Sequence, residues 1–389
     1  MPAEAKHLKT VADTRARVRT MQPLDWPFAI LVLILVVFGL VMVFSASYAY
    51  AYYRMKGDSF LYIRQQAIFA GAGVVAMFAL SMIDYHILHK FAWPIMGVTL
   101  VLLVVVLFME PLNHATRWIT LPFNLGTLQP SEIAKFALIA VFAHIISVNC
   151  ERMKKFTYGV LPFLLVMGII AFLMMQEPHL SGTILILGIG VVMMFVGGTN
   201  LLYFGIAIGG ILAALGAALV LVPDLVPYAA SRLQYWLDQF SDPLGKGHQI
   251  IQSMYAISSG GLFGLGIGNS RQKHLYVPEP ANDFIFSILC EELGFIGALL
   301  VIFLFLFLLI RGLYIAFHAK DKFGCMLVVG IMVQVILQVV LNIAVVTNTI
   351  PNTGISLPFF SYGGTALLML LGEMGVVLSV SRQSTVNKT

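Results

Sequence analysis

The sequence predicts an all-α polytopic membrane protein with about ten transmembrane helices and one large extracellular loop. Hydrophobic residues make up 59% of the 389 residues and charged residues only 11%. A soluble domain carries roughly 25% charged residues, so lipid must cover much of this surface. Apolar runs of about 20 residues, enough for one helix to cross a bilayer, recur along the chain. Runs such as Leu299–Leu309 lack the alternation of polar and apolar residues that a β-barrel strand would show.

The apolar runs divide the chain into a short tail at each end and one transmembrane domain. Residues 1–25 are a polar, basic tail, 26–382 the transmembrane domain and 383–389 a second tail. The loop 223–282 is too long for a simple connector, and loops of such length are usually functional. Ten spans are expected, at about 27–47, 66–83, 91–109, 131–149, 158–176, 182–198, 201–222, 283–311, 324–348 and 358–380.

The distribution of basic residues predicts the orientation of these spans. With the N-terminus inside, ten spans place both termini in the cytoplasm, and more than half of the 23 Lys and Arg residues fall on cytoplasmic segments. Such a bias is typical of membrane proteins. It also accounts for the net charge of +5 without nucleic acid, so no nucleic-acid partner is expected.

The first polar segment on the expected outer side runs from Arg117 to Lys135. Pro130 suits the first turn of a helix, so Glu132 and Lys135 lie three residues apart on one helix face. The pair could simply solvate the start of the helix. An ionisable pair entering an apolar span is costly, however, and usually marks a functional site.

The second polar segment precedes the span at 283–311. Two cations, Arg271 and Lys273, lie upstream of Asn282 and Asp283. Asp283 could be an ordinary helix cap, a position that favours Asp, or it could belong to a site. Further along, Glu291 and Glu292 are adjacent and thus ~100° apart on a helix. They cannot both face one substrate, so one of them is expected to pack inside the bundle against a polar partner.

A third polar segment, Asn342–Thr365, and a glycine-rich run, Gly260–Gly268, complete the unusual features. The third segment is broken by Pro and Gly and rich in hydroxyls and amides, which indicates either a buried or wet cavity or ordinary turns. The glycine-rich run lacks the strand and helix of a dinucleotide fingerprint. We expect it to provide flexibility near a bound headgroup.

Four motifs together resemble the SEDS family of bacterial cell-wall proteins, whose branches are FtsW, RodA and SpoVE. The resemblance covers about residues 25–382, and the Asn282-Asp283 pair and the short C-terminal tail are closer to FtsW and SpoVE than to RodA. One motif departs: many members carry Gln-Pro-Asp-Leu-Gly where this chain has Glu177-Pro-His-Leu-Ser-Gly. The motifs are Gln129–Lys135, Pro278–Phe286 with Glu291–Gly294, Pro351–Gly354 and Leu357–Gly364.

The resemblance implies a peptidoglycan glycosyltransferase that polymerises lipid II at the outer membrane face, in cell division or a related cell-wall process, and releases undecaprenyl diphosphate. It also implies a class B penicillin-binding protein as partner, together with other divisome or elongasome membrane proteins. The family's essential acidic residue corresponds to Asp283, the expected catalytic residue. The residues expected to bind substrate are Glu132, Lys135, Arg117, Gln129, Arg271, Lys273, Asn282 and Ser361.

Glycosyl transfer with inversion needs a base for the acceptor hydroxyl and positive charge for the departing diphosphate. A carboxylate such as Asp283 can be the base. Lys273, Arg271 and Lys135 are the candidate cations, and a divalent cation, Mg²⁺ or Mn²⁺, could share their task. Two rival functions stay open, a lipid II flippase and a scaffold without catalytic activity. A transporter places its site near the membrane midplane, whereas the polar segments here gather on one face.

Overall fold

The protein is a bundle of helices in the computed structural model, which describes residues 23–54, 57–109, 117–120, 127–177, 180–210, 236–243, 245 and 247–384. Eight helices in these ranges are long and apolar enough to cross a membrane, and two shorter apolar helices accompany them. The predicted multispan helical fold is confirmed. The helices are α2 (Trp26–Arg54), α3 (Leu61–Ser81), α4 (His86–Val106), α5 (Pro130–Val148), α6 (Phe156–Gly159), α7 (Leu161–Gln176), α8 (Leu180–Val196), an unlabelled helix Leu201–Gly210, α11 (His248–Gly260), α12 (Ile285–Phe317), α13 (Lys322–Val346) and α14 (Gly364–Arg382).

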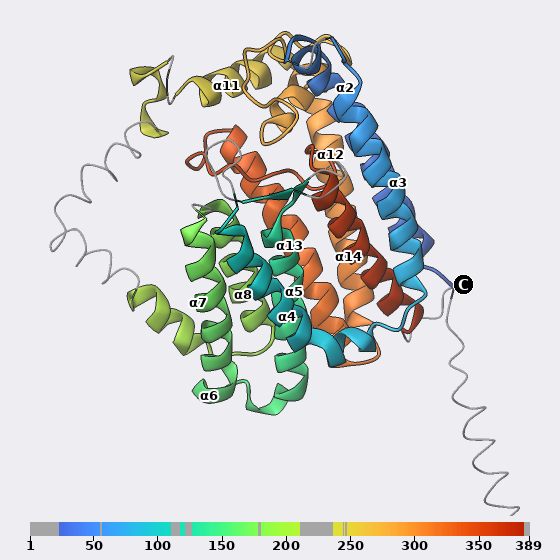
Figure 1. Ribbon diagram of the computed structural model, residues 1–389, viewed down its shortest axis with the longest axis vertical. Coiled ribbons are helices and arrows are strands. Elements are labelled where there is room, and N and C mark those ends of the chain that lie inside the picture. The colour runs from blue at the N-terminus through green and yellow to red at the C-terminus, as the bar shows by residue number, and fades with distance from the viewer. Residues whose placement is uncertain are drawn as a thin grey trace, which may run out of the picture.

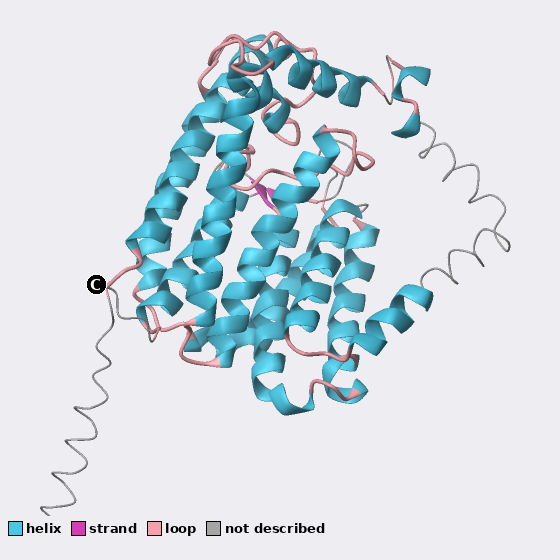
Figure 2. Ribbon diagram, turned by 180° about the vertical axis from the view of Figure 1, so that it is seen from behind, coloured by secondary structure: helices cyan, strands magenta, loops and turns pink. Residues whose placement is uncertain are grey.

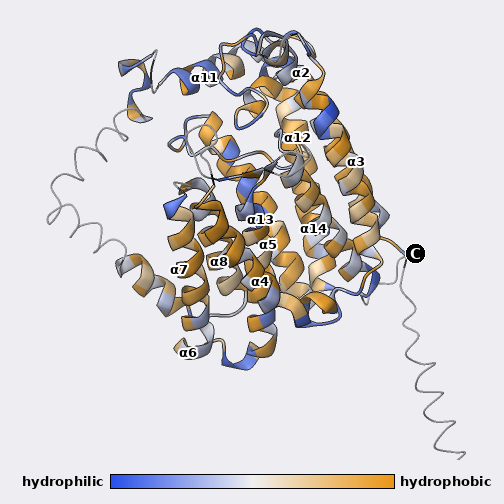
Figure 3. Ribbon diagram, in the orientation of Figure 1, coloured by the Kyte–Doolittle hydropathy of each residue, from blue (hydrophilic) through white to orange (hydrophobic). Residues whose placement is uncertain are grey.

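Three helices form the centre of the bundle. The most apolar window of α13 is 72% buried and those of α5 and α14 are each 67% buried, whereas only 22% of the window in α3 is buried. Apolar ribbon runs along the middle of the helices, and hydrophilic ribbon gathers at the two ends of the bundle (Figure 3). The helix α11 and its neighbouring loops cap one end, and α6 lies at the opposite end (Figure 1). Lipid-facing helices thus surround a core built on α5, α13 and α14.

A small antiparallel sheet precedes α5 and is visible among the helices in the view from behind (Figure 2). Its strands are β1 (Ile119–Thr120) and β2 (Thr127–Leu128), with Ile119 opposite Leu128. The Thr365 hydroxyl donates a hydrogen bond of 2.8 Å to the Thr127 carbonyl. The hairpin therefore fixes the residues on either side of it, Arg117 and Gln129, relative to the start of α14.

The helix α12 is broken near its N-terminal end, and the glycine-rich loop packs against the break. Gly294 has φ 68° and ψ −169°, which is not helical. Phe295 N–H and Ile296 N–H donate to the carbonyls of Gly261 and Leu262 at 2.9 and 3.2 Å. In return, the carbonyls of Glu291 and Glu292 accept from Leu265 and Gly266 at 3.0 and 2.9 Å. Backbone groups freed by the break are thus paired with the loop.

The expectation that the run 260–268 provides flexibility is wrong. Close packing against α12 requires its glycines: a Cβ at Gly264 would lie 2.2 Å from the Glu292 carbonyl oxygen, and one at Gly260 would lie 2.0 Å from that of Cys290. Gly264 also has φ +77°, a conformation that side chains disfavour. These glycines allow two backbones to approach each other.

The segment expected to be the large extracellular loop contains a helix, α11, which the sequence analysis did not predict. Its apolar residues Ile250, Met254 and Ile257 recur at helical spacing, the signal that could have identified it. The Ser253 hydroxyl donates to the Val346 carbonyl at 2.9 Å and so attaches α11 to the end of α13. Residues 223–235 of the expected loop, with Arg232, lie outside the described residues, as do 1–22, 385–389 and the second half of the expected span 201–222.

Candidate functional site

Asp283 lies in the connection immediately before α12. The helix begins at Ile285 with Phe284 as its N-cap, and no side chain caps it. The capping alternative for Asp283 therefore finds no support in the geometry. Its carboxylate faces the backbone of the 347–363 connection, because a Cβ on Gly354 would lie 3.0 Å from Asp283 Oδ2. Gly354 has φ +66°. Glycine at this position therefore allows the left-handed backbone conformation and leaves room for the carboxylate.

Four hydrogen bonds hold the connection that carries Asp283 and the connection before α14 together. Asn342 Nδ2, fully buried on α13, donates to the carbonyls of Asp283 and Ile355 at 2.8 and 2.7 Å. The Ser361 hydroxyl donates to the Asn282 carbonyl at 2.7 Å, and Tyr362 N–H donates to the Ala281 carbonyl at 2.8 Å. Both polar connections that the sequence singled out thus meet around Asp283.

Ser361 and Asn282, both expected to bind substrate, are already engaged within the protein. The Ser361 hydroxyl also accepts the Leu357 N–H at 2.7 Å, so it uses its donor and one acceptor position. Asn282 Nδ2 donates to Glu279 Oε2 at 2.9 Å. These contacts favour a positioning role for Ser361, and substrate binding by either residue remains a prediction.

Burial and charged neighbours shift the pKa of Asp283. Burial raises the pKa of the Asp283 carboxyl to about 6, the nearby Glu279 raises it further, and Arg117 opposes both effects. In turn, burial lowers the pKa of the Arg117 guanidinium, while Glu177 and Asp283 raise it. The structure therefore brings Arg117 from the hairpin segment to Asp283, although the two are far apart in sequence. A carboxyl with a pKa near neutrality is suited to accepting and releasing a proton.

Glu177, at the end of α7, is a site residue to which sequence reasoning gave no role. Its side chain is fully buried, and among the described residues neither carboxylate oxygen has a hydrogen-bond partner. Burial raises its pKa to about 7, and Arg117 opposes this. The Arg117 Nε–H donates a long bond of 3.4 Å to the Glu177 carbonyl. The signal was present: Glu177 occupies the one motif that departs from the family pattern, and the adjoining Pro178 and His179 lie outside the described residues.

The predicted pair at the start of α5 is formed. Lys135 Nζ lies 2.8 Å from Glu132 Oε2, and the two side chains are 4% and 17% exposed. Gln129 is the N-cap residue of α5, but its side chain makes no capping hydrogen bond. Lys135 and Glu132 also interact electrostatically with Glu373, a buried carboxyl on α14 that accepts a bond of 2.8 Å from Gln334. The sequence analysis missed Glu373, although an acidic residue inside an apolar span is itself a signal.

Lys273 belongs to a different cluster. It is buried, and its ammonium lies 2.9 Å from Glu292 Oε1, 2.7 Å from the Gly268 carbonyl and 3.2 Å from the Ser45 hydroxyl. An ammonium has three donors, so each of its hydrogens already has an acceptor. These contacts favour a structural role over the expected contact with a diphosphate, whereas the neighbouring Arg271 has an exposed side chain.

Both acidic residues of the adjacent pair pack inside the protein, where only one was expected to. Glu292 is fully buried against Lys273, and Ser45 donates to it at 2.6 and 2.7 Å. Glu291 accepts from the Ser270 hydroxyl at 2.5 Å and from Arg271 N–H at 3.0 Å. The two side chains point in different directions, as their helical spacing requires, and both fasten the loop 268–273 to α12.

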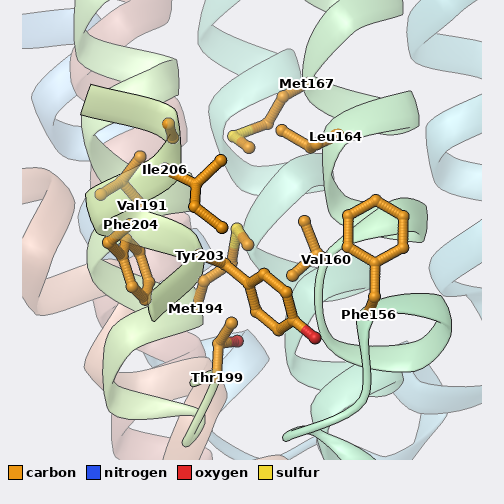
Figure 4. Close-up of a pocket in the computed structure, with 11 residues that line it drawn as sticks. Phe156, Val160, Leu164, Met167, Val191, Met194, Thr199, Tyr203, Phe204 and Ile206 are labelled. Carbon is orange, nitrogen blue, oxygen red and sulfur yellow. The ribbon is translucent and has the colours of Figure 1, made fainter. Parts of the chain in front are cut away.

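The described residues offer no preformed metal centre: no three His, Cys, Asp or Glu side chains within those ranges are grouped so as to hold a metal ion. A cavity of about 630 Å³ between α7, α8 and the helix Leu201–Gly210 is lined by apolar side chains (Figure 4). Its only side-chain oxygens belong to Thr199 and Tyr203, so it is suited to alkyl chains and not to the chemistry of a sugar diphosphate.

The fold and the site define a class: a multi-pass helical membrane protein whose polar centre, around Asp283, lies at one end of the bundle. The family model of FtsW, RodA and SpoVE, described as "Cell cycle protein", matches residues 25–386. The chain therefore belongs to this family, as the sequence resemblance predicted.

Two curated relatives extend this result. Stage V sporulation protein E of Bacillus subtilis is 42% identical over 363 residues, which cover 92% of this chain and 97% of the relative. The probable peptidoglycan glycosyltransferase FtsW of Trichlorobacter lovleyi is 38% identical over 367 residues, covering 92% and 93%. Both names belong to the branches to which the sequence motifs pointed.

Solved structures share the fold. A chain from a structure described as the structural coordination of polymerization and crosslinking by a peptidoglycan synthase complex superposes with a TM-score of 0.75 at 28% identity, covering 92% of this chain and 98% of that one. The rod shape determining protein RodA of Thermus thermophilus has a TM-score of 0.66 at 26% identity, covering 94% and 99%.

Proposed function

We propose that this chain is a peptidoglycan glycosyltransferase that joins lipid II units into glycan strands at the outer membrane face. The observation that carries the proposal is the carboxyl of Asp283, partly buried beside Arg117 at one end of the bundle and fixed by two polar connections. The relatives named as probable peptidoglycan glycosyltransferases support it. Lipid II is the substrate and undecaprenyl diphosphate the released product.

In this reaction Asp283 accepts the proton of the acceptor sugar's 4-hydroxyl. The hydroxyl oxygen forms a bond to the anomeric carbon of the donor sugar, and the bond from that carbon to the diphosphate oxygen breaks. The leaving diphosphate carries the electron pair away, and cations stabilise it. The exposed Arg271 and Lys135, which Glu132 holds in place, are the cations of this chain that we assign to that task. General-base catalysis contributes about 10²–10⁴-fold.

Purified protein supplied with lipid II in detergent tests the proposal. We expect glycan chains that grow with time, either from the protein alone or in the presence of its partner. A flippase would instead move labelled lipid II across vesicles and form no polymer, and a scaffold would do neither. If lipid II is translocated but not polymerised, both by the protein alone and by the protein with its partner, the chain is a transporter and not a glycosyltransferase.

The partner that we propose is a class B penicillin-binding protein, within a divisome or elongasome membrane assembly. A solved structure with the same fold is part of a peptidoglycan synthase complex in which polymerization and crosslinking are coordinated. A glycosyltransferase needs a crosslinking enzyme close to its product. Binding to this partner supplies the crosslinking activity that the described fold does not contain.

We further propose that both termini are cytoplasmic and that the large loop is outside. Cysteine labelling tests this with Ser241→Cys, placed in a Cys150→Ser background because native Cys150 is exposed. In intact spheroplasts, a membrane-impermeant maleimide is expected to label the introduced thiol. The control is a separate preparation of the protein with its native cysteines. There Cys150, at the other end of the bundle, should react only after permeabilisation. The reverse pattern would invert the topology.

A second prediction concerns the pair at the start of α5. Lys135→Gln is expected to lower polymerisation on the order of 10²-fold, because it removes a preorganised cation from the departing diphosphate. The melting temperature should fall as well, because Lys135 is only 4% exposed and its loss leaves Glu132 without its cation, so polymerisation is compared on folded protein at a temperature below the transition. Glu132→Gln is the companion variant, since it releases Lys135 from its ion pair. If both proteins polymerise lipid II at the wild-type rate, the pair only solvates the helix start.

A third prediction uses the pKa of Asp283, which burial and Glu279 raise to about 6 and Arg117 lowers. Because the base works in its ionised form, polymerisation should fall as the pH drops through about 6. Arg117→Gln removes the opposing charge, so the pKa rises and the acid limb of the rate profile should move up by about one pH unit. Arg64→Gln, an exposed pair with Asp58, is the control. If the acid limb does not move, Arg117 does not influence the pKa of Asp283.

A further inference from the structure

A second cavity, more polar than the first, lies at the opposite end of the bundle from Asp283, between α4, the end of α5, α6 and the start of α7. It is open to the surface, and its empty volume, with this open space included, is about 600 Å³. Its lining combines aromatic, polar and aliphatic side chains, including Trp93, His144, Asn149, Thr157 and Tyr158. This mixture of rings and polar atoms is typical of the level at which lipid headgroups meet water. None of these residues takes part in the proposed chemistry.

One polar atom in this cavity has no partner. His144 Nδ1 is buried and, among the described residues, makes no hydrogen bond. The ring lies 4.4 Å from that of His89, centre to centre, and His89 Nε2 lies 3.2 Å from the Ser147 hydroxyl. A buried ring nitrogen without a partner costs free energy unless a ligand or water completes it. His144, a lining residue of the cavity, therefore carries hydrogen-bonding capacity that the described protein groups do not use.

Positive charge surrounds the cavity. The Arg152 guanidinium lies 5.5 Å from the ring centre of Tyr158, a lining residue. Lys154 and Lys155 are exposed in the same connection, and Lys90 precedes the lining residue Trp93 by one helical turn. Glu151 is the only carboxylate in the connection between α5 and α6. This connection is one of the hydrophilic segments at the end of the bundle (Figure 3).

We propose that this cavity binds the phosphodiester headgroup of an anionic phospholipid. The cations attract the phosphate, and His144 and Asn149 offer hydrogen bonds to it. The surrounding apolar surface of α4, α5 and α7 accommodates the acyl chains. Basic pockets between transmembrane helices bind such headgroups in the same way. The inference does not depend on the glycosyltransferase activity, because it concerns a separate end of the bundle.

Binding of short-chain phosphatidylglycerol and phosphatidylcholine to the detergent-solubilised protein, counted by native mass spectrometry, tests the proposal. We expect one tight site for phosphatidylglycerol and no comparable site for phosphatidylcholine. Arg152→Gln with Lys155→Gln should weaken binding by about 25-fold, because each cation near the membrane surface contributes about fivefold. Lys320→Gln with Lys322→Gln removes the same charge from the exposed α12–α13 connection and should have little effect.

Quenching of Trp93 fluorescence shows whether the lipid binds in this cavity. Phosphatidylglycerol with brominated chains should quench the fluorescence of the wild-type protein more than that of Trp93→Phe. His144→Ala should also weaken binding without lowering the lipid-free melting temperature. Equal weakening by both double variants would mean unspecific attraction, and equal binding of phosphatidylcholine would mean an apolar site. Competition by inorganic phosphate alone would mean a site for free phosphate. Each of these three results would overturn the proposal.

Discussion

Replacing Asp283 with asparagine is expected to abolish glycan polymerisation and to leave the fold intact. The amide keeps the size of the side chain but cannot accept the proton of the acceptor hydroxyl. General-base assistance contributes about 10²–10⁴-fold, and the rate should fall by a factor in this range. The connection around Asp283 is held through its backbone carbonyl, by Asn342, and through Ser361. Neither contact involves the carboxylate, so stability should be retained.

The measurement is chain formation from lipid II, with the melting temperature recorded on the same preparation. Asp283→Glu is the matched variant: it keeps a carboxyl but displaces it toward Gly354, whose backbone lies against Asp283 Oδ2. Partial activity is expected from this variant at most. Substantial polymer from well-folded Asp283→Asn protein would remove Asp283 from the role of base.

Replacing Lys273 with methionine is expected to destabilise the protein strongly, by about 3–5 kcal/mol. The substitution leaves Glu292 with no cation, and its side chain is 0% exposed. The loop 268–273 would also lose the bonds from Lys273 to Ser45 and Glu292, although its bonds to Glu291 would remain. A substrate contact predicts the opposite result, namely a normal melting temperature and lost polymerisation. Thermal unfolding in detergent therefore separates the two roles of Lys273.

Two further variants sharpen this measurement. Arg271→Met changes an exposed cation in the same loop and should hardly alter the melting temperature. The double variant Lys273→Met with Glu292→Gln removes both charges and should recover part of the lost stability, because no unpaired buried charge remains. A normal melting temperature for Lys273→Met alone would return Lys273 to the list of substrate-binding candidates.

Local patterns predicted the helices and much of the candidate site. Apolar runs identified the spans because a bilayer imposes one length on every crossing helix. The Pro130 start and the i,i+3 spacing predicted the contact between Glu132 and Lys135, since helical geometry alone brings them together. The polar connections around Asp283 and Ser361 stood out because polar groups are costly in an apolar chain.

The roles of several residues depend on tertiary contacts and could not be predicted from local sequence patterns. Lys273 and Arg271 look equivalent in sequence, yet only Lys273 meets a buried carboxylate, and its partner Glu292 is on another element. The glycines of 260–268 suggested flexibility because their real constraint, the backbone of α12, is invisible in their own segment. Glu177 and Arg117 are similarly separated in sequence, so their electrostatic contact emerges only from the folded chain.

The break at Gly294 also makes the position of Asp283 less dependent on the thickness of the surrounding bilayer. A continuous helix of 33 residues would be about 50 Å long, far more than the ~30 Å of a hydrocarbon core. Such a helix must tilt when the bilayer thins. The segment before Gly294 is held by the glycine-rich loop and by Lys273, whereas the segment after it is bonded to that loop at Phe295 and Ile296, at its very start. The remainder of the second segment can therefore change its tilt with less effect on the first. Asp283 can then keep its position in membranes of different lipid composition.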